Sequence, residues 1–131
     1  MARLADLVLD CPHPASLARF WAEVLDGYAV APYDDAELER LRSIGVLDPE
    51  DDPSVLVEGP GPRLFCQRVP EAKSAKNRMH VDLVSDDLDG EIARLLALGA
   101  TRLDHQPPPG GDGLVALADP AGNEFCIRAA R

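Results

Sequence analysis

The sequence is poor in cysteine and in basic residues, and each shortage excludes a class of protein. Only three of the 131 residues are cysteines, an odd number without a Cys-x-x-Cys pair, so a disulfide-stabilised fold is not expected. Thirteen Lys and Arg stand against 23 Asp and Glu, which gives a formal net charge of −10. This balance argues against nucleic acid and against anionic membranes as partners, because both are bound by an excess of basic side chains.

Long hydrophobic runs are also missing. No stretch approaches the roughly 20 apolar residues that span a bilayer. The first residues, MARLAD, lack the basic segment and long apolar run of a signal peptide, so a cytoplasmic location is expected. The chain is 46% hydrophobic and 27% charged, which is ordinary for a globular protein, and its length predicts a single domain over residues 1–131.

The first half of the chain reads as a strand, a helix and further strands. Residues 3–10 are rich in Leu and Val and predict a strand. An amphipathic helix follows, and Gly27 is expected to end it. Its apolar stripe consists of Leu17, Phe20, Trp21, Val24 and Leu25. Shorter strands are predicted at 27–33, 55–57 and 63–69.

The same order of elements returns in the second half. Residues 79–85 predict a strand, Asp86 and Asp87 suit a helix N-terminus, and Gly99 suits the helix end. The apolar stripe of this helix consists of Leu88, Ile92, Leu95 and Leu96. Strands are predicted at 101–104, 113–118 and 123–129.

Two pairs of segments support an internal repeat. LARFW at 17–21 is similar to IARLL at 92–96, and FCQR at 65–68 is similar to FCIR at 125–128. An α+β protein built from two βαβββ modules is therefore predicted. The alternative is a ferredoxin-like α+β domain, which would have fewer strands after each helix.

The two modules are expected at about 1–70 and about 77–131, and an insertion at 34–53 breaks their symmetry. The insertion predicts a short helix followed by an acidic loop at 48–53. We expect this loop to be a solvated surface excursion.

Two motifs carry a resemblance to a known family. KNRMHVDL at 76–83 and DPAGNEFC at 119–126 resemble the glyoxalase-like branch of the vicinal-oxygen-chelate superfamily, and the resemblance spans nearly the whole chain. The segment Asp-Pro-x-Gly-Asn-x-Phe is its most specific part. The resemblance implies paired βαβββ modules that form a cupped, partly open mixed β-barrel with helices outside. It also implies a homodimer and a small-molecule site in the concave sheet.

Metal-dependent members of that superfamily hold a divalent ion at four sheet positions. By resemblance these positions fall on Asp6, on Cys66 or Gln67, on His80 and on Cys126, and only His80 agrees with the usual pattern. Side chains alternate along a strand, so only one of Cys66 and Gln67 can face the cup. Carboxylate, imidazole and thiolate suit zinc. Glyoxalase I activity is not expected, because Cys126 replaces the glutamate that moves the proton in that reaction.

His80 and Asp6 are the candidate catalytic residues, because an imidazole and a carboxylate are both able to transfer protons. Asp82 shares a strand face with His80, as Asp10 does with Asp6. A loop at 105–113, rich in Pro and Gly, is expected to form a lip over the pocket. The remaining candidate ligand-binding residues are Cys66, Gln67, Arg68, Asp82 and Cys126.

Three functions remain open at this point: a lyase- or isomerase-like enzyme with or without a divalent metal, a metal-free protein that sequesters a small ligand, and a domain that binds only another protein. Aromatic residues make up only 5% of the chain, which disfavours a purely sequestering site walled by aromatic rings. No residue pattern identifies the ligand.

Overall fold

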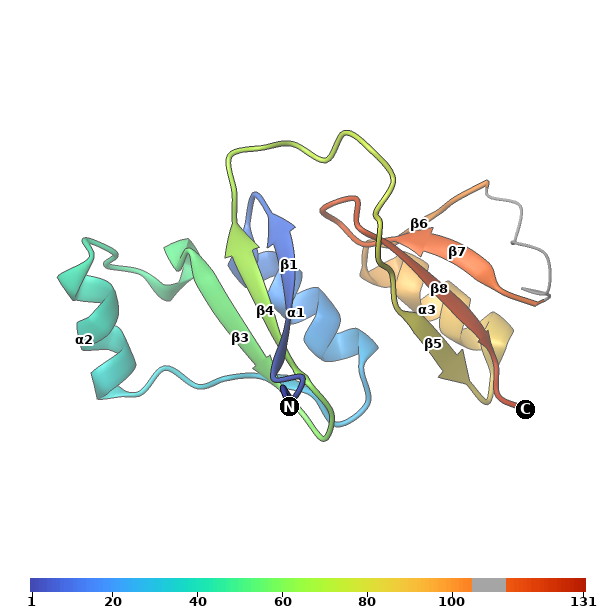
Figure 1. The fold of residues 1–131 in the computed structure, drawn as a ribbon, viewed down its shortest axis with the longest axis horizontal. Coiled ribbons are helices and arrows are strands. Elements are labelled where there is room, and N and C mark those ends of the chain that lie inside the picture. Colours follow the sequence, from blue (N-terminus) through green and yellow to red (C-terminus); the bar gives the residue numbers. More distant parts are fainter. Residues whose placement is uncertain (105–112) are drawn as a thin grey trace. The chain divides into compact units, whose positions relative to one another are not determined.

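The computed structural model describes residues 1–104 and 113–131, and the chain divides into two compact units, Met1–Ala72 and Lys73–Arg131 (Figure 1). Each unit contains one four-stranded mixed sheet. The predicted α+β class and the two βαβββ modules are confirmed. Within the described ranges, no helix combines the length and hydropathy of a membrane span. Most of the predicted lip at 105–113 lies outside the described residues.

In the first unit, the strands lie in the order β1-β4-β3-β2. β1 runs parallel to β4, and the other neighbours are antiparallel. A 3-10 helix, η1 (Pro49–Asp51), and helix α2 (Asp35–Ser43) form the predicted insertion between β2 and β3. The remaining elements are β1 (Asp6–Cys11), α1 (Pro14–Val24), β2 (Ala29–Val30), β3 (Ser54–Glu58) and β4 (Arg63–Arg68).

The second unit repeats this topology. Its strands lie in the order β5-β8-β7-β6, and β5 runs parallel to β8. The elements are β5 (Asp82–Ser85), α3 (Leu88–Leu98), β6 (Thr101–Arg102), β7 (Val115–Ala118) and β8 (Glu124–Ala129). The matching strand order confirms the duplication at the level of topology.

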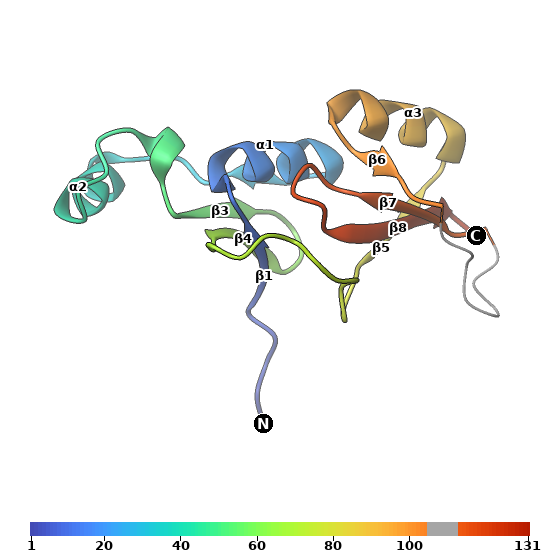
Figure 2. The same cartoon turned by 90° about the horizontal axis from the view of Figure 1, so that it is seen from above.

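One helix covers one face of each sheet (Figure 2). The helical stripes are buried as predicted at Leu17 and Phe20 in α1 and at Ile92 and Leu95 in α3. On the strands, alternate residues point to the helix and are buried. The face opposite the helix is called the open face below. Buried strand residues are Val55, Val57, Leu64, Cys66, Phe125 and Ile127.

Several elements are shorter than the sequence predicts. β2 covers only Ala29–Val30 of the predicted strand at 27–33, although the Ala31 N–H beyond it still donates to the Leu56 carbonyl at 2.9 Å. Helix α1 ends at Val24, where Leu25 adopts an extended backbone, and Gly27 turns the chain beyond it with φ +75°. β5 begins at Asp82, so His80 lies just before the strand.

The predicted equivalence of FCQR at 65–68 and FCIR at 125–128 is wrong, because corresponding residues of the two segments lie on opposite faces of their sheets. Cys66 is fully buried on the helix face, whereas Cys126 lies on the open face of β8 and is only partly buried. Phe65 is on the open face, whereas Phe125 is buried. The two segments therefore differ by one residue in phase, and a one-residue shift places every side chain on the other face.

The expectation of a solvated loop at 48–53 is wrong for one residue. Asp52 is only 1% exposed, and its carboxylate accepts hydrogen bonds from Tyr33 and Ser54, which flank the insertion. Glu50, in contrast, is exposed and accepts two hydrogen bonds of 2.8 Å from the Arg19 guanidinium on α1. The insertion thus packs against α1 of its own unit.

Candidate functional site

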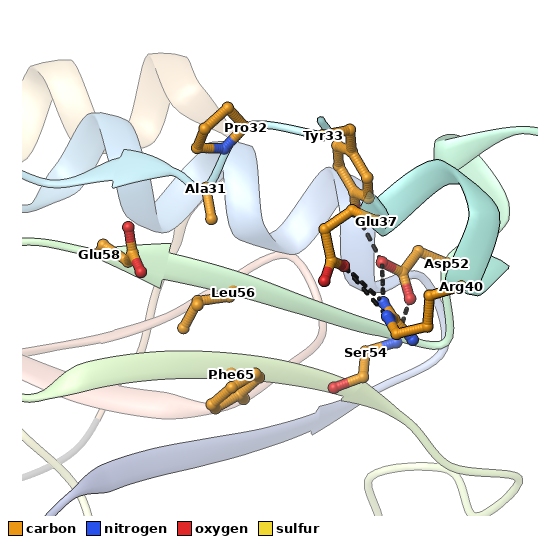
Figure 3. Close-up of a pocket in the computed structure, with 10 residues that line it drawn as sticks. All are labelled: Ala31, Pro32, Tyr33, Glu37, Arg40, Asp52, Ser54, Leu56, Glu58 and Phe65. Carbon is orange, nitrogen blue, oxygen red and sulfur yellow. Dashed lines mark hydrogen bonds and ion pairs between the residues drawn. The ribbon is translucent and has the colours of Figure 1, made fainter. Parts of the chain in front are cut away.

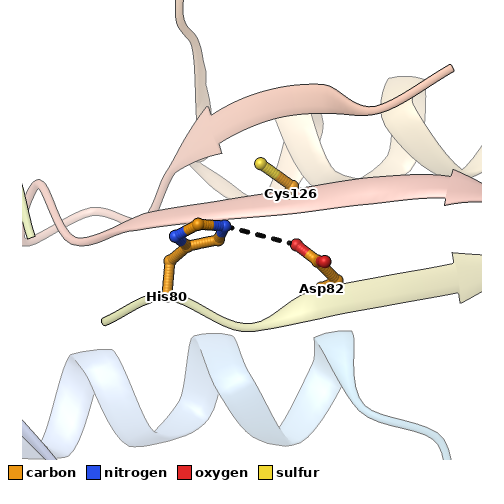
Figure 4. Close-up of side chains that lie close together, drawn as sticks. All are labelled: His80, Asp82 and Cys126. Carbon is orange, nitrogen blue, oxygen red and sulfur yellow. Dashed lines mark ion pairs between the residues drawn. The ribbon is translucent and has the colours of Figure 1, made fainter. Parts of the chain in front are cut away.

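The second unit brings together three candidate residues on its open face (Figure 4). Asp82 and Cys126 are register partners on the adjacent strands β5 and β8. The Nε2 atom of His80 lies 3.5 Å from Oδ1 of Asp82. One donor atom from each of the three side chains lies within 4.8 Å of the other two. We call this group the His80 cluster.

Glu124 fixes the segment that leads to His80. Its carboxylate accepts hydrogen bonds from the Asn77 backbone N–H at 2.9 Å and from the Lys73 ammonium at 3.1 Å. Burial opposes ionisation of Glu124, but these hydrogen bonds outweigh it and lower the pKa of the carboxyl. The Val81 carbonyl then accepts from the Cys126 N–H at 3.0 Å, which holds this segment beside β8.

The thiol of Cys126 is shielded from ionisation. Burial raises its pKa, and the charge of Asp82 raises it further. Without a bound cation, the cluster therefore presents an imidazole, a carboxylate and a neutral thiol.

A divalent ion fits this donor set. Imidazole nitrogen, carboxylate oxygen and thiolate sulfur are all zinc ligands, with bonds of roughly 2.0–2.3 Å, so the donors of one ion lie within about 5 Å of each other. The side chains of the His80 cluster meet that condition. Asp82 joins the expected set as an additional donor.

The other candidates lie in the first unit. The Asp6 carboxylate pairs with the Arg63 guanidinium at 2.8 Å on the neighbouring strand. Gln67 is the register partner of Asp10 and is exposed, whereas Cys66 points to the helix face. Gln67 therefore shares the open face with Asp6.

Arg68 ends β4 and is exposed, and its Nε donates to the Pro12 carbonyl at 3.4 Å. This contact holds the guanidinium at the end of the strand.

The first unit also has a pocket of about 520 Å³ between its open face and the insertion (Figure 3). Strands β3 and β4 supply the apolar side chains Leu56 and Phe65, which are register partners. The other lining residues are Ala31, Pro32, Tyr33, Glu37, Arg40, Asp52, Ser54 and Glu58.

A polar network closes one end of this pocket. The Tyr33 hydroxyl donates to Asp52 at 2.7 Å, and the Ser54 N–H donates to the same carboxylate at 2.9 Å. The Arg40 guanidinium donates to Glu37 at 3.1 Å and lies 3.7 Å from Asp52. No sequence pattern predicted this network. One feature of the sequence could have indicated it. Tyr33 and Asp52 lie close to the two points where the insertion leaves and rejoins the sheet.

Tyr33→Phe is expected to lose less stability than the wild type when the pH is raised from neutral to alkaline. Burial raises the pKa of Tyr33, and the hydrogen bond to Asp52 raises it further. A raised folded-state pKa stabilises the fold below the unfolded value of about 10, and this contribution is lost as the pH rises above that value. Chemical denaturation at about pH 8 and about pH 11 should show a smaller alkaline loss in Tyr33→Phe than in the wild type. Equal losses would show that Tyr33 is not responsible.

The Asp119–Asn123 motif has a structural role in this fold. Asp119 is 2% exposed, and its carboxylate accepts from the N–H groups of Ala121 and Asn123 at 2.9 Å. The Asn123 side chain donates to it at 3.2 Å, and Gly122 has the positive φ of +91° that the turn requires. The motif thus shapes the turn from β7 into β8, which carries Cys126.

Solved structures show the same fold at low sequence identity, whereas no curated protein matches the chain by sequence. A glyoxalase/bleomycin resistance protein/dioxygenase family enzyme from Burkholderia phytofirmans PsJN is 12% identical with a TM-score of 0.67, over 99% of this chain and 100% of that one. The fosfomycin resistance protein FosX from Mesorhizobium loti is 15% identical with a TM-score of 0.65, over 100% and 94%.

A FosX variant from Listeria monocytogenes, complexed with manganese(II) and 1S,2S-dihydroxypropylphosphonic acid, is 12% identical with a TM-score of 0.67, over 100% of this chain and 92% of that one. These likenesses show the vicinal-oxygen-chelate fold. At the level of sequence, the family model of the glyoxalase-like domain matches residues 6–128. The chain therefore belongs to the glyoxalase-like domain family.

Proposed function

We propose that this protein binds a small polar molecule on the open faces of its sheets and acts on it as an enzyme through the His80 cluster. The observation that carries the proposal is the convergence of imidazole, carboxylate and thiol on one sheet face. The fold family supports it, because the FosX variant from Listeria monocytogenes binds manganese(II) and a small polar phosphonic acid.

His80 and Asp82 have separate roles in this proposal. The His80 imidazole accepts or donates the proton at the reacting atom, because an imidazole ring can act both as a base and as an acid. Asp82, 3.5 Å away, stabilises the imidazolium when it forms. When a divalent ion is bound, His80 and Asp82 would instead be its ligands, and the ion would supply Lewis-acid polarisation of a ligand oxygen. Glyoxalase I chemistry is outside the proposal, because Cys126 takes the place of the expected glutamate.

His80→Ala is expected to weaken zinc binding by about 100-fold or more, because loss of even an outer-shell partner costs about 10- to 100-fold. Isothermal titration calorimetry of the full chain with zinc should show one site in the wild type.

His13→Ala is the matched control. His13 is exposed at the start of α1, and its side chain makes no capping hydrogen bond. Zinc affinity should be unchanged in this variant. Equal affinity in the wild type and His80→Ala, or no binding by either, would remove the metal from the His80 cluster.

A metal-free sequestering function is the second candidate. Val8, Phe65 and Leu56 form an apolar row across β1, β4 and β3 on the open face, and Val8 is 52% exposed. Such a row would hold the apolar part of a trapped ligand. Native mass spectrometry of the purified chain would detect a co-purified organic molecule, and it would also test the homodimer that family resemblance implies. For either function, we propose the cytoplasmic location that the sequence predicts.

A further inference from the structure

The pocket of the first unit has an excess of negative charge. Its lining contains three carboxylates, those of Glu37, Asp52 and Glu58, and a single guanidinium, that of Arg40. This net negative charge favours a cationic ligand, because the electric field of the carboxylates attracts a positive charge into the pocket.

The one basic group of the pocket is already engaged. Arg40 Nη2 lies 3.0 Å from the Glu37 carboxylate and 3.7 Å from that of Asp52. An anionic ligand would have to break these ion pairs. Arg40 is therefore better placed to complete the wall of the pocket than to bind an anion.

Glu58 differs from the other two carboxylates. It is exposed at the end of β3, and within residues 1–104 and 113–131 it forms no ion pair or side-chain hydrogen bond. Leu56 and Phe65 separate it from the network of Tyr33 and Asp52 (Figure 3). The pocket thus has a free carboxylate at one end, an apolar middle and hydroxyl groups at the other end.

We infer that this pocket takes a small organic cation, namely a primary amine carried on an apolar body about the size of one ring. The ammonium group pairs with Glu58, and the body lies over Leu56 and Phe65. The hydroxyls of Tyr33 and Ser54 contact the far end of the ligand. This inference rests on the proposed function, because it names the ligand class of the open face in the first unit.

Three probes of similar shape and different charge test the inference: phenethylamine, phenethyl alcohol and hydrocinnamate. Each is titrated at millimolar concentrations into the isotopically labelled full chain, and amide chemical shifts are followed by NMR. Phenethylamine should shift Leu56 and Phe65 and bind more tightly than the alcohol. Glu58→Gln should weaken amine binding by about three- to fivefold, the effect of an exposed ion pair.

Glu39→Gln is the matched control, because Glu39 lies on α2, is highly exposed and is not part of the pocket. It should bind phenethylamine as the wild type does. Tighter binding of hydrocinnamate, equal amine affinity in Glu58→Gln, or no binding of the amine would each overturn the inference.

Failure here and failure of the proposed function give different results. Loss of the zinc response in His80→Ala with no amine binding removes only the ligand class. Amine binding at Leu56 and Phe65 without a zinc response in the wild type supports the ligand class and removes the metal from the His80 cluster.

Discussion

Asp119→Ala is expected to lower the free energy of unfolding by about 3 kcal/mol, because it leaves buried hydrogen-bond donors without an acceptor. The donors are the N–H groups of Ala121 and Asn123 and the Asn123 side chain. Since the carboxylate is almost completely buried, water does not easily replace it. Chemical denaturation of the wild type and the variant measures the difference.

Asp119→Asn and Asp86→Ala are the comparisons for this change. Asn keeps one acceptor oxygen of the same size, so it should lose less stability than Ala. Asp86 is exposed in the same unit, and its replacement should change stability by no more than about 0.5 kcal/mol. A loss in Asp119→Ala no larger than that in Asp86→Ala would contradict the structural role of the motif.

Asp52→Ala is expected to lower the free energy of unfolding by about 3 kcal/mol and to remove the polar end of the pocket. The variant leaves the Tyr33 hydroxyl and the Ser54 N–H without their acceptor, and it removes a charge that faces Arg40. Denaturation, with the intrinsic fluorescence of Trp21 as the signal, measures the loss.

Asp51→Ala provides the control for Asp52→Ala. Asp51 is the adjacent residue in the sequence, ends η1 and is exposed. Its replacement should leave both stability and phenethylamine binding nearly unchanged. If the two variants behave alike, the Asp52 network does not hold the insertion in place.

The two halves of the chain carry different chemistry on the same topology. The second unit has the His80 cluster on β5, on β8 and on the residue segment just before β5, whereas β1 and β4 of the first unit carry the Asp6–Arg63 ion pair. The first unit instead has a pocket whose wall is its own insertion. The two units thus share a strand order, whereas their open faces carry different residues.

The elements with strong periodic patterns were predictable from the sequence. Ile92 and Leu95 of the predicted α3 stripe are buried, although Leu96 is 40% exposed, and Gly99 caps α3 with φ +115°. These features were predictable because apolar spacing and a left-handed cap are local properties. Asp87 also caps α3 as expected and accepts from the Gly90 N–H at 3.1 Å. The length of β2 was not predictable, because it depends on pairing with β3, which is distant in the sequence.

The candidate site was only partly predictable. His80 and Asp82 were close in sequence, and alternation along a strand placed them on one face. The choice between Cys66 and Gln67 depended on which face of β4 meets α1. The sequence similarity around Cys66 and Cys126 predicted the same face for both residues and was wrong. Sequence similarity between two short segments does not determine which of their residues point to the core.

The sequence by itself determined the duplicated α+β architecture and the two amphipathic helices, because these follow from local periodicity. Side-chain chemistry added only the prediction that His80 is a site residue. The tertiary structure alone decided that Asp52 is buried, that Cys126 meets Asp82 and that Glu58 faces a pocket. These facts depend on strand register and on the packing of the insertion, which bring together residues that are distant in the sequence.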